Sequence, residues 1–289
     1  MIYEYAAAFV EGAQLYNPET GKMDGILASA KHFLGDGATY WGVDQGNNTV
    51  YNVKAFLEHN YQGYAGAVSE CVGNVMCSYS AVNFIPMASN SFLLNGILKE
   101  GLLDGHPFNG FVISDYDELG KMAHGKWPTT PIVMEQYDAV VLMINAGVDM
   151  AMLTPYTDTL TIEYFQDALK TAVAQNDITM SRIDDAVRRI LGVKMAMGLI
   201  KEKSSDSSLP FMNDYLYQKL SALEARNPTT YEHAWDAALD AAQKSLVLLK
   251  NDDDYLPVQK DSLKYIILVG DRAVDQIYEG QKDRVKTVY

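Results

Sequence analysis

Cysteine and long apolar runs are scarce in this sequence, and each scarcity excludes a class of protein. Only two of the 289 residues, Cys71 and Cys77, are cysteines, which is too few for a disulfide framework or a thiolate zinc site. No run reaches the ~18 apolar residues that a membrane-spanning helix requires. Residues 1–17 lack the basic start and apolar stretch of a signal peptide and instead predict a helix.

Positive charge is also scarce, because 23 Lys and Arg residues stand against 37 Asp and Glu, for a net charge of −14. Such an acidic surface repels nucleic acid and anionic lipid, so neither is expected as a partner. No G-x-G-x-x-G motif follows an apolar run, which disfavours dinucleotide binding. A neutral ligand remains compatible, and 19 tyrosines would suit stacking on sugar rings, although tyrosine is also common in cores.

Apolar runs and helical periodicities alternate along the first half of the chain. Strands buried on both faces are predicted at residues 26–34, 74–79, 110–114 and 147–153. Amphipathic helices are predicted between them, at residues 65–72, 91–102 and 134–146. Repeated strand–helix units indicate an α/β architecture with a parallel sheet.

The second half of the chain is predicted to be mainly helical. Helices are expected at residues 162–174 and 178–199, the latter with Ser181 as its N-cap and Gly198 at its end. A polar stretch around residues 202–232 precedes a further helix at 231–249. An apolar run at 264–270 predicts a strand that would begin a second sheet.

Polar side chains gather where the predicted strands end, which is where α/β folds place their functional groups. Lys31, His32 and Asp36 follow the first run, Tyr79 ends the second, and Asp115 directly follows the third. A carboxylate at the end of a buried strand is costly unless it is paired or used. The sequence therefore predicts a functional site at this edge, around Asp115.

Several motifs in order carry a resemblance to a known family. They are KHFLGDG, VMCSYSAVN with NSFLLNGILKEGL, FNGFVISDYDELG, NAGVDMAM and SRIDDAVRRILGVKMAMGL. Together they resemble glycoside hydrolase family 3, and within it the β-glucosidase and exo-β-glucanase branch. The resemblance covers nearly all of residues 1–270. It implies a retaining glycosidase that acts on a β-glucoside or β-glucan oligosaccharide and needs neither metal nor cofactor.

The resemblance also implies how the chain is organised. Residues 1–202 would be the C-terminal part of a (β/α)8, TIM-like barrel, and 203–262 a linker with a helix. Residues 263–289 would be the start of an α/β sandwich. The family's other barrel strands and its acid/base Glu would lie outside the sequence, so we expect an internal piece of a longer enzyme. Relatives are often secreted or lysosomal, but localisation and oligomeric state stay open.

Individual site residues follow from the resemblance. Asp115 matches the nucleophile, while Lys31 and His32 match residues that grip sugar hydroxyls. We expect Lys31 and His32 to share one hollow with Asp115, with the Lys31 ammonium keeping the carboxylate ionised. A retaining mechanism needs a second carboxyl to protonate the departing oxygen. Asp36 is expected to be a structural turn residue.

Other matched positions depart from the family pattern. Gln45 stands where relatives often have Glu, and Tyr79 where they have an aromatic hydroxyl near the nucleophile. Tyr116 replaces the usual Trp and Lys121 replaces an Arg, and both changes bear on the leaving-group side. Three residues after Asp115 are weighed as substitute acids and disfavoured on geometric grounds: Asp117, Glu118 and His124.

Three alternatives remain. A β-N-acetylhexosaminidase of the same family would have Pro and His where this chain has Leu34 and Asp36. A Schiff-base enzyme would need a desolvated Lys31, whereas this lysine adjoins His32 and carboxylates. A non-catalytic sugar-binding remnant would keep the fold and the binding residues without turnover.

Overall fold

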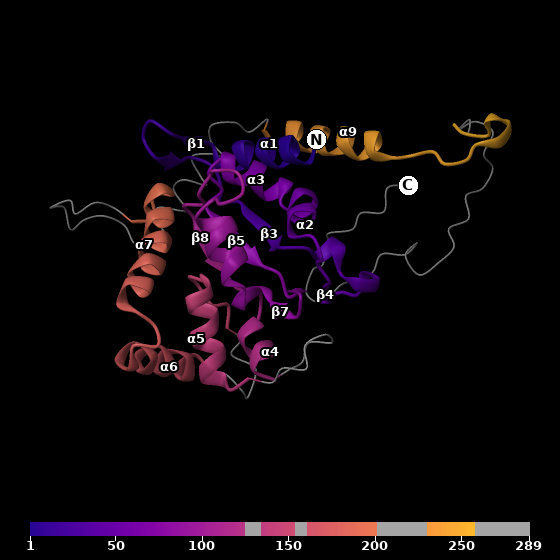
Figure 1. Ribbon diagram of the computed structural model, residues 1–289. Helices are drawn as coiled ribbons and strands as arrows, with labels where there is room; N and C mark the ends of the chain where they lie inside the picture. The colour runs from indigo at the N-terminus through magenta and orange to yellow at the C-terminus, as the bar shows by residue number, and fades with distance from the viewer. Residues whose placement is uncertain (125–133, 154–160, 201–229, 258–289) are drawn as a thin grey trace. The chain divides into compact units, whose positions relative to one another are not determined.

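The computed structural model of the protein describes residues 1–124, 134–153, 161–200 and 230–257 (Figure 1). Contacts divide the chain into two units, residues 1–215 and 216–289. In the second unit the described residues form helix α9, Thr230–Ser245, and the short 3-10 helix η5, Asp252–Asp254. The strand predicted at 264–270 and the predicted domain boundary near 202 lie outside the described residues.

A parallel three-stranded sheet forms the centre of the first unit. It has the order β3–β5–β8, with bounds Ser29–Phe33, Asn74–Cys77 and Phe111–Ile113. Asn74 lies opposite both Ser29 and Phe111, which fixes the register. Three of the predicted strands are thus confirmed, although the first is shorter than predicted. The fourth was wrong as a strand, because only Met150 pairs, in a single bridge to Ile113.

Helices surround this sheet in chain order (Figure 1). The first unit contains α1 (Ile2–Gln14), α2 (Val53–Asn60), α3 (Gln62–Ser69), the π-helix η4 (Phe92–Lys99), α4 (Glu118–His124), α5 (Gln136–Ala146), α6 (Ile162–Gln175) and α7 (Met180–Ala196). A hairpin of β1 (Tyr16–Asn17) and β2 (Lys22–Met23) follows α1. A small sheet joins β4 (Asn47–Asn48), β6 (Ala81–Val82) and β7 (Ile85–Pro86), and the short 3-10 helices are η1 (Asp36–Ala38), η2 (Tyr40–Gly42) and η3 (Met87–Ser89).

Local sequence chemistry explains most of the helix ends and corrects one prediction. Helix α7 is capped by Thr179, whose hydroxyl accepts the Arg182 N–H, and not by Ser181, which lies inside the helix. Both are hydroxyl residues, so the sequence did not separate them. Helix α5 ends at Gly147, whose φ of 119° suits glycine.

Apolar side chains from both faces of the sheet form the core. Phe33, Val75, Cys77 and Val112 are fully buried. This double burial explains why the strands are nearly continuous apolar runs rather than alternating ones. Cys77 is a free, packed thiol, and burial raises its pKa well above the ordinary value.

The side chain of Gln14 joins the end of α1 to two strands. Its Nε2 donates to the Cys71 carbonyl at 3.0 Å, and its Oε1 accepts the N–H groups of Ala28 at 3.2 Å and Gly73 at 3.0 Å. Gln14 is completely buried, so these bonds satisfy polar groups that water does not reach.

A buried ionic cluster around Asp149 joins β8 to helices η4 and α7. The Asp149 carboxylate accepts the Val112 N–H and a bond from Lys99, each at 2.8 Å, and also pairs with Arg182. Arg189 bonds the carbonyls of Phe108 and Gly110 at 2.7 and 3.0 Å. Burial lowers the pKa of Lys99 to about 8, although Asp149 opposes the shift.

Candidate active site

Side chains from the carboxyl ends of all three central strands line one cavity of about 290 Å³. His32 comes from β3, Tyr79 follows β5, and Asp115 follows β8. The loop after β3 adds the remaining lining residues, which are Asp36, Asp44 and Gln45. Parallel strands place their carboxyl ends at one edge of the sheet, so residues distant in sequence meet there. The predicted gathering of His32, Tyr79, Gln45 and Asp115 is therefore observed.

Asp115 presents one carboxylate oxygen to this cavity. Its Oδ1 accepts the Tyr116 N–H at 2.6 Å, and its Oδ2 lies 3.6 Å from Nε2 of His32. The side chain is 14% exposed, so it is shielded without being sealed. Its backbone N–H donates to Oε2 of Glu118 at 2.9 Å. The result is a half-buried acid with a defined orientation.

His32 lies between two carboxylates. Nδ1 is 3.3 Å from Oδ2 of Asp36, while Nε2 faces Asp115. Asp36 also accepts bonds from the hydroxyls of Ser78 and Ser80, the latter at 3.1 Å. These bonds agree with the structural role predicted for Asp36, and they let the same carboxylate orient the His32 ring.

Lys121 of helix α4 lies beside Gln45 and Tyr79, two residues that line the cavity. Its Nζ donates to Oε1 of Gln45 at 2.8 Å and lies 3.3 Å from the centroid of the Tyr79 ring. Burial lowers the pKa of Lys121, while the Asp115 charge opposes that shift. The Tyr79 hydroxyl donates to the carbonyl of Tyr116, and burial followed by the Asp115 charge raises the Tyr79 pKa.

Lys31 does not share the cavity, so the expectation of a common hollow with Asp115 was wrong. Lys31 lines a separate cavity of about 370 Å³ beside α1 and α3, together with Ala28, Ser29 and Ala30. No ion pair joins Lys31 to Asp115 among the described residues. A role of Lys31 in sugar binding stays a prediction.

The residues that follow Asp115 occupy different environments. Tyr116 is 48% exposed, whereas Glu118 is completely buried. Burial, reinforced by the Asp115 charge, raises the pKa of Glu118 to about 8. None of Asp117, Glu118 and His124 is among the described residues that line the cavity. This agrees with the expectation that none of them serves as the acid.

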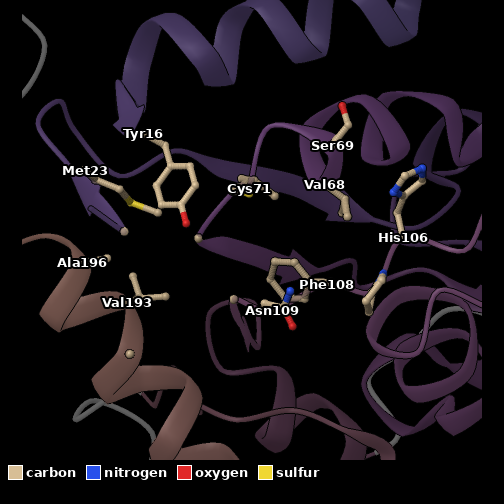
Figure 2. A pocket seen from close by; sticks show the side chains of 16 residues that line it. Tyr16, Met23, Val68, Ser69, Cys71, His106, Phe108, Asn109, Val193 and Ala196 are labelled. Carbon is tan, nitrogen blue, oxygen red and sulfur yellow. The ribbon is translucent and has the colours of Figure 1, made fainter. Parts of the chain in front are cut away.

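A larger cavity of about 460 Å³ lies at the opposite ends of the strands, beside Gly73 and Gly110. Figure 2 shows Tyr16, Phe108 and Val193 around it. Within the described ranges, no three metal-ligating side chains come together, and no helix has the length and apolarity to cross a membrane.

Comparison with known proteins identifies the class of this site. The model of the glycosyl hydrolase family 3 N terminal domain matches residues 1–193. A beta-xylosidase of Formosa agariphila is 28% identical over 96% of this chain and 35% of its own length. A periplasmic beta-glucosidase of Salmonella typhimurium is 30% identical over 87% of this chain and 29% of its own length.

A solved structure agrees with these relatives. An exo-1,3/1,4-beta-glucanase from a Pseudoalteromonas species matches with a TM-score of 0.65 and 31% identity, over 89% of this chain and 28% of that one. The relatives are glycosidases. The chain belongs to glycoside hydrolase family 3, which confirms the resemblance seen in its motifs. It spans about a third of the length of the curated relatives.

Proposed function

We propose that this chain carries the sugar-binding pocket and nucleophile of a retaining β-glucosidase or exo-β-glucanase. The observation that carries the proposal is the Asp115 carboxylate, whose Oδ2 faces a cavity beside His32. Polar groups of Asp36, Asp44 and Gln45 line the same cavity and can bond the hydroxyls of a terminal glucosyl unit. The cavity's size suits one sugar ring better than a chain.

The proposed reaction begins at this carboxylate. Asp115 attacks the anomeric carbon, the bond to the departing oxygen breaks, and a glycosyl ester forms; water then hydrolyses the ester with net retention. A second carboxyl must protonate the departing oxygen. We assign that role to a group outside the described residues, as the resemblance to the family implies; Glu118 is sealed from the cavity, and Asp36 is engaged by serine hydroxyls.

The proposal includes the barrel. Strands β3, β5 and β8 are parallel and adjacent, and Met150 continues the order past β8. This is the arrangement expected of consecutive strands in a (β/α)8 barrel. Three paired strands and one bridge cannot close a barrel by themselves, so closure needs further strands.

A fluorinated substrate tests the nucleophile without needing an acid. In 2-deoxy-2-fluoro-β-glucosyl fluoride the leaving group departs as fluoride without protonation, and the ester with the nucleophile turns over slowly. Incubation with the full chain should add one fluoroglucosyl unit per molecule. Intact-mass spectrometry followed by peptide mapping should place that unit on Asp115.

Two variants make the labelling experiment decisive. Asp115→Asn should not be labelled, whereas Asp138→Asn, at an exposed acid of α5, should be labelled at the wild-type rate. Labelling of another residue, or equal labelling of Asp115→Asn, would refute the assignment. Tight glucose binding without any labelling would favour a sugar-binding remnant.

A further inference from the structure

We propose that Glu118 is a positioning residue, whose buried carboxyl holds the Asp115 peptide so that the Asp115 carboxylate stays turned toward the cavity. The inference rests on the proposed function, because it assigns a partner to the proposed nucleophile. Glu118 is not among the residues that line the cavity, so we assign it a role through Asp115 rather than contact with the sugar.

The geometry that carries the inference is a short local bond. Oε2 of Glu118 accepts the Asp115 N–H at 2.9 Å, and the side chain has no exposed surface. The other oxygen, Oε1, has no hydrogen-bond partner within the described part of the chain. A buried acid with an unpaired oxygen lowers the stability of the folded chain, which suggests that Glu118 serves a purpose other than stability.

The spacing resembles one half of a capping box. In a capping box, the side chain of the third helical residue accepts the N–H of the cap, and the cap side chain accepts the N–H of that third residue. Glu118 makes the first of these bonds to Asp115. The Asp115 side chain does not make the second, because its Oδ1 accepts the Tyr116 N–H instead. Helix α4 begins only at Glu118, whose own N–H donates to the Asp115 carbonyl at 3.3 Å, so the Asp115 side chain caps no helix and its Oδ2 faces His32.

The charge state of Glu118 suits this role. Burial raises its pKa to about 8; the Asp115 N–H bond, the Ala88 backbone and Lys121 oppose that shift, and the Asp115 charge adds to it, so the carboxyl is mostly protonated at neutral pH. A neutral carboxyl still offers an acceptor to the Asp115 N–H. It places no second negative charge beside the nucleophile, where repulsion would favour protonated Asp115.

Isofagomine provides a probe of the Asp115 orientation. This piperidine sugar mimic carries its positive charge at the anomeric position, so its affinity depends on a carboxylate aimed at that point. We expect Glu118→Gln, which keeps a neutral acceptor, to bind isofagomine within about twofold of the wild-type full chain. Glu118→Met, which removes the acceptor at similar volume, should bind at least about tenfold more weakly by calorimetry.

A matched control separates positioning from general destabilisation. Leu119→Ala empties the adjacent buried site without touching the Asp115 N–H, and it should lower the melting temperature while leaving the affinity unchanged. Glu118→Ala serves as a second variant without an acceptor, should Glu118→Met fail to fold.

The possible outcomes are distinct. Wild-type affinity in folded Glu118→Met or Glu118→Ala would overturn the inference, as would a loss in Leu119→Ala that matches theirs. Equal loss in Glu118→Gln would overturn it as well. If Asp115→Asn itself bound as tightly as wild type, the proposed function would fail first. If Asp115→Asn bound weakly while Glu118→Met did not, only the inference would fail.

Discussion

Two carboxylates tied to the same strand differ in what surrounds them. Asp149 has no exposed side-chain surface, and it is bonded to the Val112 N–H, Lys99 and Arg182. Asp115 follows β8, keeps 14% of its side chain exposed, and directs one oxygen at a cavity. Both are acids held by hydrogen bonds, but of the two only Asp115 lines the cavity.

This difference separates an acid that supports the fold from one that can do chemistry. Burying a charge is offset only when its hydrogen-bonding capacity is used, as it is at Asp149. Asp115 is held by backbone bonds and leaves Oδ2 available. The distinction depends on how many hydrogen bonds and ion pairs each carboxylate makes within the protein. Substitution at either position tests it.

The largest predicted effect is on stability at the ionic cluster. Asp149→Ala leaves Lys99 and Arg182 without their shared carboxylate, so we expect the free energy of unfolding to fall by about 3–5 kcal/mol. Asp115→Asn should change it by less than about 1 kcal/mol, since its shape is kept and no partner is orphaned. Urea unfolding of both variants measures the contrast, and similar losses would break the comparison.

A second effect, smaller for each pH unit, concerns the pH dependence contributed by Glu118. Folding raises its pKa from 4.5 to about 8, so the folded chain keeps a proton that the unfolded chain releases. The contribution to stability is full below the unfolded pKa and falls as pH rises through the folded one, by up to about 1.4 kcal/mol per pH unit.

Glu118→Gln cannot ionise and should lack this slope. Urea unfolding of wild type and Glu118→Gln between about pH 5 and pH 8 isolates the difference, because other titrating groups are common to both chains. Parallel stability curves would show that Glu118 is ionised in the folded chain, contrary to the expected effect of its burial.

The smallest predicted effect lies at the rim of the cavity. Gln45→Glu creates an ion pair with Lys121, which is partly exposed, so the coupling should stay below about 1 kcal/mol. A double-mutant cycle with Lys121→Met measures it. A coupling of several kcal/mol would mean that this edge is as desolvated as the Asp149 cluster, which would remove the contrast between the two regions.

The fold was predictable where the pattern is long or apolar on both faces. The 178–199 pattern predicted α7, and the run at 74–79 predicted β5. Periodicity did not distinguish the π-helix Phe92–Lys99 from an α-helix, because both present apolar residues at similar spacings. The run at 147–153 failed as a strand because hydrophobicity alone cannot show whether a partner pairs with it.

The site was predictable only in part, for a similar reason. The strand ends and the family motifs indicated His32, Tyr79 and Asp115, and the cavity contains all of them. They did not indicate which of the two adjacent residues, Lys31 and His32, lines the Asp115 cavity, so the prediction that Lys31 shares that cavity was wrong. The burial of Glu118 and the nearness of Lys121 to Tyr79 depend on how α4 packs, which no local pattern encodes.

The bonds of Gln14 have a consequence for how the chain can vary. The side-chain amide of Gln14 accepts the N–H groups of Ala28 and Gly73, and backbone bonds join Ala13 to Ile26 and Gln14 to Gly25. The β1–β2 hairpin therefore begins and ends at residues that are hydrogen-bonded to each other. Residues could be inserted into or deleted from its tip without shifting β3. Length variation among homologous chains is therefore expected in this hairpin, while the spacing from Ile26 to His32 should stay constant.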